Sequence, residues 1–513
     1  MCPSHVDDNN MSGIFEILCG LTIIILLLYY YLISMFYYWK VRGVKGPRPI
    51  PLFGNLMDIL FDKTNLSDYL VYLYNSYKDE PYVGIFFRSR PILLIKDPQL
   101  IKDILIKDFS CFPQRGTTVT KKIDPLTENL IFLEALRWKP LRNKLTPAFS
   151  SAKLKEMFPL IIICSDHLEQ YINKLPNNVI LNVGELTTKY TIDIVGNCAF
   201  GIEMNALKIN EENEFIKMGK DIFSINIMPI LKYRLQTHFP EIYNHLGFIF
   251  GNTRQSSFFS DIVKQTMEYR IKNNIVRHDF INILMELKSN PEKLGEEIEL
   301  TDSLCAAQAF VFFAAGFETS SSTILYILYE LAQNHKIQDK LRKEINEEYE
   351  KNNGILKFES IRTLKYLHAV IKETLRKHPP ITNLSRDCMV PSYTFRDTKL
   401  TVQKHQRIFI SIIGLHHDPN IYPNPDVFDP ERFLTENNKI NDGTYLPFGR
   451  GPRNCIGEKF AELQVISGVA TFLRNCKVDV CEKTEIPFKS SRSDFLLISK
   501  NGIYLKISKI NKE

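Results

Sequence analysis

One stretch near the C-terminal end decides the fold of this 513-residue chain: Tyr445-Leu446-Pro447-Phe448-Gly449-Arg450-Gly451-Pro452-Arg453-Asn454-Cys455-Ile456-Gly457. Its prolines and glycines are dense, so an irregular loop is predicted. Apolar residues then recur at helical spacing, as at Phe460, Leu463 and Ile466, which predicts an amphipathic helix. Cys455 would therefore lie just before a helix N-terminus, where free backbone N–H groups stabilise a thiolate. A thiolate in such a place is a strong ligand for iron.

Cys455 has two interpretations from these residues alone: an iron ligand, or a buried structural cysteine, which is the commoner role of a lone cysteine. The stretch resembles the haem-ligand signature of the cytochrome P450 superfamily, Phe-x-x-Gly-x-Arg-x-Cys-x-Gly. All five fixed positions match, at Phe448, Gly451, Arg453, Cys455 and Gly457. Five fixed residues over about 500 starting positions give on the order of 10⁻⁴ chance matches. The resemblance implies that Cys455 is the axial thiolate of a haem b, and that Phe448 and Arg453 contact the cofactor, Arg453 at a propionate.

A second motif lies in a long helix that is predicted over Asp302 to Ala332 and is largely apolar all round, as a buried helix is. The helix carries Ala315-Gly316-Phe317-Glu318-Thr319-Ser320. This segment is interpreted either as a packing notch with a satisfied threonine or as a widened helix with a groove for oxygen and water. It resembles the distal-helix motif of the same family. The resemblance implies that Thr319 hydrogen-bonds to bound dioxygen and that Glu318 helps to relay protons. Val311, Ala315 and Thr319 share a helix face at spacing four, so they are expected to line the haem side.

Two further matches indicate a structural charge cluster. Glu373 and Arg376 lie three residues apart on a helix expected over Leu364 to His378, where such a pair is usually solvated and worth little. Arg432 follows in the segment Asp429-Pro430-Glu431-Arg432-Phe433. Both segments resemble family motifs whose glutamate and two arginines form an interior cluster behind the haem loop. The resemblance therefore implies a structural role for these three residues.

The remaining haem contacts are expected from a helix near residue 140 and from two isolated arginines. Trp138-Lys139-Pro140-Leu141-Arg142 matches the family's Trp-x-x-x-Arg helix, which implies that Trp138 and Arg142 contact a propionate. An indole N–H and a guanidinium suit carboxylates. Pro140 is expected in the first turn of that helix, where proline is tolerated. Two more arginines fall where the family places propionate ligands, Arg115 and Arg386.

An uncharged run of 23 residues from Ile17 to Trp39 is long enough to cross a membrane as a helix, for which about 20 apolar residues suffice. A cleaved signal peptide is the alternative, but the run is too long and no small-residue cleavage site follows. Its aromatic end, Phe36 to Trp39, suits the headgroup boundary. Acidic residues precede the run and basic residues follow it, so the positive-inside tendency puts the bulk of the chain in the cytoplasm.

These features predict four parts of the chain, in the membrane of the endoplasmic reticulum. They are a luminal extension (residues 1–16), a transmembrane anchor (17–39), a basic, proline-rich linker (40–55) and a haem-thiolate catalytic domain (56–513). The domain is expected to be mainly α with small β-sheets (α+β), because helical spacing dominates after residue 97 and strand-like runs occur at Pro81 to Ile95. The cytochrome P450 fold implied by the resemblance, preceded by one transmembrane helix, agrees with this.

The composition of the chain limits which ligands and partner proteins are expected. The net charge is +6, from 64 Lys+Arg and 58 Asp+Glu, and no long basic run argues for nucleic acid. Ten scattered cysteines, none in a CxxC pair, suggest neither a structural zinc site nor an oxidising compartment. No GxGxxG follows a predicted strand, so electrons from NADPH must arrive indirectly through a partner. The resemblance names that partner as an NADPH-dependent flavoprotein reductase, with cytochrome b5 as a second candidate.

Within the family, the likeness is to the microsomal branch that includes insect detoxifying and vertebrate drug-metabolising enzymes, as in Asn143 to Ser151 and Asn197 to Glu203. It implies a monooxygenase that inserts one atom of O2 into small lipophilic substrates, such as plant toxins, insecticides, hormones or lipids. A haem-thiolate isomerase or dehydratase that uses no external O2 is the alternative, and a non-catalytic haem- or ligand-binding protein is another. The intact Glu318-Thr319 pair argues against the isomerase.

Two surfaces complete the predictions. Phe215 to Phe250 is expected to form two helices and a loop that roof the substrate pocket, although ordinary core packing would explain the same apolar residues. Basic residues near the cysteine loop are expected to dock the acidic electron donor, although a solvated basic face is the commoner case. The residues proposed for docking are Arg137, Lys139, Lys144 and Lys459.

Overall fold

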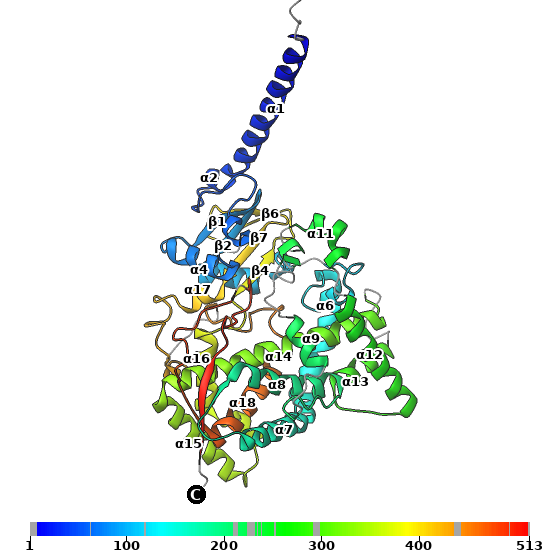
Figure 1. Cartoon of the computed structure of the whole chain (residues 1–513), viewed down its shortest axis with the longest axis vertical. Coiled ribbons are helices and arrows are strands. Elements are labelled where there is room, and N and C mark those ends of the chain that lie inside the picture. The colour runs from blue at the N-terminus through cyan, green and yellow to red at the C-terminus, as the bar shows by residue number, and fades with distance from the viewer. Residues whose placement is uncertain are drawn as a thin grey trace, which may run out of the picture.

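The computed structural model of the chain shows a helical domain with small sheets and a long helix projecting from it (Figure 1). The described residues are 8–61, 63–116, 119–208, 214–222, 231–232, 234–236, 239–250, 253–290, 298–434, 443–491 and 493–510. The helices in chain order are α1 (Asp8–Met35), α2 (Tyr37–Val41), α3 (Met57–Leu60), α4 (Leu66–Ser76), α5 (Pro98–Lys102), α6 (Ala135–Leu145), α7 (Ser151–Lys174), α8 (Val183–Val195), α9 (Glu214–Ile222), α11 (Pro240–Leu246), α12 (Thr253–Asn273), α13 (Phe280–Lys288), α14 (Asp302–Gln333), α15 (His335–Lys351), α16 (Lys365–Lys377), α17 (Ile412–His416) and α18 (Glu458–Asn475). The strands are β1 (Tyr82–Phe87), β2 (Arg90–Ile95), β3 (Val179–Asn182), β4 (Asn383–Asp387), β5 (Ser392–Thr394), β6 (Thr401–Gln403), β7 (Arg407–Ser411), β8 (Cys476–Asp479) and β9 (Tyr504–Lys509). The predicted fold class is confirmed.

A four-stranded sheet lies at the end of the domain nearest to α1, with the order β1-β2-β7-β4. The strand-like runs predicted from Pro81 to Ile95 are β1 and β2, which pair antiparallel, while β7 joins β2 in parallel and β4 pairs antiparallel with β7. Side chains alternate between two buried clusters, so Ile85 faces one and Phe86 the other. A sheet covered on both faces favours the β-branched and aromatic residues found here. The two smaller sheets have the orders β3-β9-β8 and β5-β6.

α14 runs through the helical part of the domain and packs against α8, α12 and α18 (Figure 1). It begins where the Thr301 hydroxyl accepts a hydrogen bond from the Leu304 N–H at 3.2 Å, a side-chain cap. From Ser320 to Ala332 every side chain is buried, which confirms the predicted core helix. α14 is long and apolar enough to span a membrane, but most of its apolar stretch is buried inside the domain.

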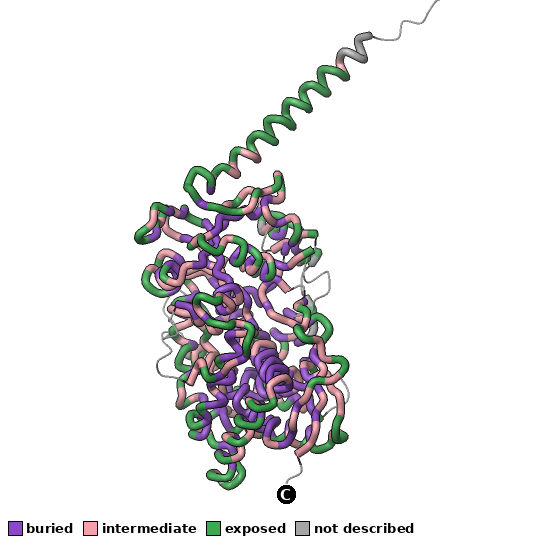
Figure 2. The backbone as a smooth tube through the Cα atoms, turned by 90° about the vertical axis from the view of Figure 1, so that its left-hand side faces the viewer, coloured by how far each residue is buried: buried purple, intermediate pink, exposed green. Residues whose placement is uncertain are grey.

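The other helix of that length and hydropathy is the N-terminal one, Gly13–Val41, which is a candidate membrane span. None of its most apolar stretch is buried, and it stands clear of the domain (Figure 2). The aromatic end differs from the headgroup position expected for it. Trp39 is only 3 % exposed, because its ring packs against the four-stranded sheet and its indole N–H donates to the Ile85 carbonyl at 2.9 Å.

The chain after α2 also lies on this sheet. The Gly84 N–H donates to the Lys45 carbonyl at 2.9 Å, and the Asn55 N–H donates to the Phe86 carbonyl at 2.7 Å. The basic, proline-rich segment is therefore an extra layer along the edge of β1 and not a free spacer.

Candidate active site

Residues 446–457 form the irregular loop that the sequence predicts around Cys455. Gly449 and Gly451 have φ angles of +68° and +74°, which side chains rarely adopt. A Cβ atom on Gly451 would also lie 1.8 Å from the Leu105 carbonyl oxygen, so the signature glycine is required twice over. The Cys455 N–H donates to the Phe448 carbonyl at 2.8 Å. α18 begins at Glu458, which places Cys455 just before a helix N-terminus, as predicted.

The Cys455 side chain is exposed, yet protein surrounds it closely enough for desolvation to raise the pKa of its thiol. The Gly457 backbone N–H, Arg142 and Arg115 lower this pKa, and Glu458 raises it further. The backbone N–H at the helix N-terminus therefore lowers the pKa of the Cys455 thiol, as predicted, but the rise caused by burial is larger. A bound metal cation deprotonates a coordinating thiol outright. Cys455 is therefore suited to be a metal ligand and poorly suited to be a free nucleophile.

Arg453 is almost fully buried and lies over the Trp138 ring, 3.9 Å from its centroid. Its Nε donates to the Pro113 carbonyl at 3.1 Å, and its Nη2 donates to the Leu133 carbonyl at 2.9 Å. Arg453 therefore holds the chain before α6 against the cysteine loop. This is a structural task in addition to the predicted contact with a propionate.

Three more predicted arginines gather around the same loop. Arg115 donates to the Arg453 carbonyl at 2.7 Å, and Arg142 donates to the carbonyl and the amide oxygen of Asn454 at 2.9 and 3.0 Å. Arg386, on β4, donates from Nη1 to the Ser385 carbonyl at 2.8 Å, and its buried Nε has no hydrogen-bond partner. Among the described residues, none of these four arginines forms an ion pair with a carboxylate.

Burial without a carboxylate partner among the described residues lowers the pKa values of these arginines. Burial lowers the pKa to about 10 for Arg115, about 9 for Arg386 and about 8 for Arg453. After burial, the next causes for Arg453 are its neighbours Arg115, Arg386 and Arg142, because like charges disfavour one another. Buried charges are normally paired. A ligand with carboxylates would supply the pairing that the described residues do not provide.

α14 places the predicted oxygen-side pair on one turn of helix. The Thr319 hydroxyl donates to the Ala315 carbonyl at 2.7 Å, which leaves the Thr319 oxygen free to accept a hydrogen bond. Burial raises the pKa of Glu318 to about 7, and a hydrogen bond from Ser322 opposes the rise. Glu318 can therefore hold or release a proton near neutral pH. α14 is α-helical throughout, so the widened helix considered from the sequence is not found.

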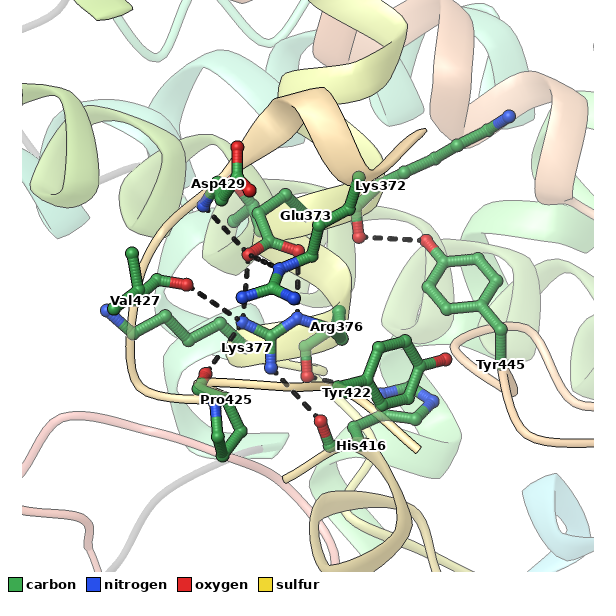
Figure 3. Close-up of polar contacts among 12 residues, drawn as sticks. Lys372, Glu373, Arg376, Lys377, His416, Tyr422, Pro425, Val427, Asp429 and Tyr445 are labelled. Atoms are coloured by element: carbon green, nitrogen blue, oxygen red, sulfur yellow. Dashed lines mark hydrogen bonds and ion pairs between the residues drawn. The ribbon is translucent and has the colours of Figure 1, made fainter. Parts of the chain in front are cut away.

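The structural charge cluster forms as predicted (Figure 3). Glu373 and Arg376 are fully buried on α16 and are joined by two hydrogen bonds, from Arg376 Nε at 2.8 Å and from Nη2 at 2.9 Å. Arg432 Nε lies 3.4 Å from Glu373 Oε1. Arg376 also donates to the carbonyls of His416 and Pro425 at 3.0 and 2.8 Å. The buried carboxylate is thus shared between two arginines.

His416 connects this charge cluster to the cysteine loop through hydrogen bonds with Arg376 and Leu446. Nothing in the sequence indicated this role for His416. The Leu446 N–H donates to His416 Nε2 at 2.9 Å, so that nitrogen is unprotonated. Burial lowers the pKa of His416 to about 3, which keeps the ring neutral. Asn454, which accepts hydrogen bonds from Arg142, was also not predicted, because it occupies a variable position of the signature. A polar side chain beside the cysteine is the only signal that could have indicated it.

α6 differs from the prediction at Pro140. The helix begins at Ala135, so Pro140 is its sixth residue and lies beyond the first turn. Proline has no N–H, so the Leu136 carbonyl lacks its usual donor within the helix. The Leu136 side chain is 80 % exposed, and water can reach this part of the helix.

Comparison with known proteins identifies the family. The cytochrome P450 family model matches residues 44–506. The chain is 40% identical over 490 residues to cytochrome P450 6a2 of Drosophila melanogaster, covering 93% of this chain and 96% of that protein. It is 37% identical to cytochrome P450 6A1 of Musca domestica (93% and 95% covered) and 35% identical to cytochrome P450 6k1 of Blattella germanica (92% and 93% covered). The chain belongs to the cytochrome P450 family.

Membership makes this cytochrome P450 a monooxygenase, with haem b as its cofactor and NADPH acting indirectly through a reductase, and the relatives named above are insect enzymes. The residues present fit the cofactor. An accessible cysteine offers a soft ligand to iron, and buried arginines without carboxylate partners, one of them with an orphaned Nε, offer cations to the two propionates. Among the residues that the structure describes, no three His, Cys, Asp or Glu side chains lie close enough together to hold another metal ion.

The predicted pocket roof is only partly described. Phe223, Ile225, Ile227 and Met228 lie outside the described residues. Leu231 is 46 % exposed. The Arg88 guanidinium lies over the Phe239 ring, with its central carbon 4.9 Å from the centroid of the ring. The prediction that this segment roofs the pocket of the cytochrome P450 remains a prediction.

Proposed function

We propose that this cytochrome P450 oxidises small lipophilic compounds, such as plant toxins, insecticides, hormones or lipids, at the cytoplasmic surface of the endoplasmic reticulum. The apolar helix of residues 17–39 anchors it there, except for its aromatic end at Trp39, which packs on the domain, and residues 1–16 face the lumen. The observation that carries the catalytic part is the accessible Cys455 surrounded by arginines that lack carboxylate partners. The membrane part rests on the apolar helix Gly13–Val41, which the domain leaves uncovered.

The cysteine loop and its arginines hold the cofactor in this proposal. Cys455 binds the iron, and Arg115, Arg142, Arg386 and Arg453 bind the propionates together with Trp138, while Phe448 fixes the loop through its carbonyl. Haem b, once bound, supplies the activation of dioxygen by two electrons. The Glu373 cluster and His416 keep the loop in place, since they are joined to it through the Leu446 N–H.

Thr319 and Glu318 control protons on the other side of the cofactor. The Thr319 hydroxyl is turned to the Ala315 carbonyl, so its oxygen accepts a hydrogen bond from a protonated group in the site. Glu318 exchanges protons near pH 7, because its pKa is about 7. A proton donor is most effective when its pKa is close to the working pH.

A flavoprotein reductase supplies the electrons, and cytochrome b5 is a second donor in this proposal. Lys139 and Lys459 are exposed near the cysteine loop and suit an acidic partner. Arg137 suits it less well, because its guanidinium lies 2.7 Å from the buried Glu128 carboxylate. Lys144 is partly buried. The docking surface therefore rests mainly on the two exposed lysines.

The proposal is tested with the full-length protein in lipid bilayers with a reductase and NADPH. A panel of lipophilic compounds should shift the haem spectrum and give hydroxylated products, with NADPH consumed in step. Charge reversal at Lys139 and Lys459 together should slow this reaction and flatten its dependence on salt, while turnover driven by added peroxide survives. An equal loss by both routes would reject the docking surface. The absence of oxygen-dependent products from the whole panel would reject the substrate class.

A further inference from the structure

We propose that Trp39 locks the catalytic domain to the end of α1, so that the N-terminal helix is a rigid handle and not a flexible tether. The lock is a contact within this chain and goes beyond the function proposed above. Its consequence for orientation rests on the membrane anchoring in that proposal.

The lock is built around a ring and a glycine. The Trp39 ring is 3 % exposed and lies directly over Gly84 in β1. A Cβ atom on Gly84 would lie 2.5 Å from Trp39 Cγ, which is closer than real contacts allow. The indole N–H donates to the Ile85 carbonyl at 2.9 Å, a backbone acceptor on the same strand. The ring thus fills a place that only glycine leaves open.

Contacts on either side of Trp39 reinforce the lock. The Phe36 and Phe86 rings meet edge to face with centroids 5.1 Å apart. The Tyr38 hydroxyl donates to the Gln406 amide oxygen at 3.0 Å, next to β7. Val44 is buried in the same cluster, and its N–H donates to the Trp39 carbonyl at 3.0 Å. These contacts reach β1 and Gln406, the residue just before β7, so the segment is held at more than one point and cannot rotate about a single bond.

The connection to α1 leaves little slack. α1 ends at Met35, α2 begins at Tyr37, and the single residue between them, Phe36, keeps a helical backbone conformation. Trp39 is four residues beyond the end of α1, which is about 6 Å at 1.5 Å per residue. A flexible linker needs many more residues to let a domain reorient freely. The orientation of the sheet, and of the cysteine loop behind it, is therefore tied to the direction of α1.

The lock has a function in the reaction. An electron donor held in the same membrane can meet the cysteine loop only if that loop faces it at the right height. A domain fixed to its anchor presents the loop in one orientation, which removes the orientational search that slows the docking of two proteins. Trp39 is in this sense a positioning residue for electron delivery, and it touches neither substrate nor cofactor.

The test compares full-length, haem-loaded variants that differ only at the lock. In detergent, trypsin should cut the bond after Lys40, inside α2, roughly a hundredfold faster in Trp39→Ala than in the parent, because loss of a buried tryptophan opens the segment. Tyr37→Ala is the matched control, since that aromatic residue of the same helix is 52 % exposed. Equal cutting of Trp39→Ala and Tyr37→Ala would overturn the proposal.

Gly84→Ala tests the lock from the other side. It should also speed the cleavage, since the new methyl group displaces the ring. Added to Trp39→Ala it should have no further effect, because the ring that it displaces is gone. Full additivity of the two substitutions would overturn the pairing of Trp39 with Gly84. Trp39→Phe keeps most of the packing and should show a smaller increase, which preserves the test if Trp39→Ala does not fold.

Orientation is measured in aligned lipid bilayers by linear dichroism of the haem bands. The parent and Tyr37→Ala should share one tilt, whereas Trp39→Ala and Gly84→Ala should lose most of the dichroism and slow the reductase-supported reaction but not the peroxide-driven one. Unchanged dichroism in the two lock variants would overturn the proposal, because the tilt would then be set elsewhere. Failure of the parent chain to enter bilayers would reject the membrane anchoring alone, and the cleavage test in detergent would still decide on the lock.

Discussion

Two groups of buried arginines hold the cysteine loop, and their charges are met in opposite ways. Arg376 and Arg432 share the Glu373 carboxylate, and the other Arg376 donors are received by carbonyl groups. Arg386 and Arg453 have no carboxylate partner among the described residues, and burial followed by the charge of the neighbouring Arg115 lowers the pKa of both. A closed group belongs to the framework, because its charges are neutralised within the fold. A group without an internal counter-charge, which we call the open group, can bind an anionic ligand. Here the open group is Arg386 and Arg453, and it lies beside the cysteine loop.

The largest effect is expected when the closed group is opened. Glu373→Gln leaves the fully buried Arg376 guanidinium without its carboxylate partner, which should cost about 3–5 kcal/mol of unfolding free energy and most of the haem content. The matched control is Glu431→Gln, because Glu431 makes an exposed ion pair with Lys340 at 2.5 Å. The control should lose less than about 1 kcal/mol. Denaturant unfolding compares them, and equal losses would contradict the distinction between a closed group and a surface pair.

The next effect separates the two groups of arginines by how much each contributes to the stability of the haem-free protein. Arg386→Met removes a buried charge that has no counter-charge, so the unfolding free energy of haem-stripped protein should change by less than about 1 kcal/mol. Haem should dissociate roughly ten- to a hundredfold more readily, since a charge-assisted contact to it is lost. Arg376→Met should instead destabilise the stripped protein severely. The comparison fails if Arg386→Met destabilises the stripped protein as much as Arg376→Met does.

A smaller effect is expected on the oxygen side. Thr319→Ala removes the hydroxyl that orders protons, so roughly tenfold more NADPH should end as hydrogen peroxide for each product formed, with little change in substrate binding. Thr323→Ala is the control, because Thr323 is one turn further along α14 and donates to the Thr319 carbonyl at 2.8 Å. Peroxide and product are measured together. Unchanged coupling across several substrates would remove Thr319 from the mechanism.

The last expected effect is a slope of stability with pH. Burial raises the pKa of Glu318 to about 7 from an ordinary value of 4.5, so between these pH values the folded chain keeps a proton that the unfolded chain has lost. Unfolding free energy therefore falls as pH rises from about 4.5 through 7. Glu318→Gln cannot ionise and should lose this contribution. Parallel stability curves for parent and variant at pH 5 and pH 8 would show that Glu318 is not shifted.

Sequence and structure agree where local pattern decides. The loop at Cys455 and the buried helix around Thr319 follow from glycine density and apolar spacing, which act over a few residues. The strand-like runs from Pro81 to Ile95 follow in the same local way from β-branched and aromatic residues. The residues that join distant segments could not be found in this way. His416 reaches Leu446, and Arg142 reaches Asn454, only after the chain has folded. The position of Trp39 was misjudged for the same reason, because an aromatic residue at the end of an apolar run fits a lipid headgroup as well as it fits a glycine on a sheet.

The most direct measurement of the central claim is the absorption spectrum of the reduced carbon monoxide complex of Cys455→Ser. The thiolate ligand causes the strongly red-shifted Soret band of this family, and serine cannot replace it. We predict that the variant loses this band, while Cys481→Ser, a change at a partly buried cysteine in a hydrogen-bonded turn with Thr484, keeps it. A Cys455→Ser protein that retained the band would show that another residue ligates the iron and would contradict the assignment of the open arginine group to the haem.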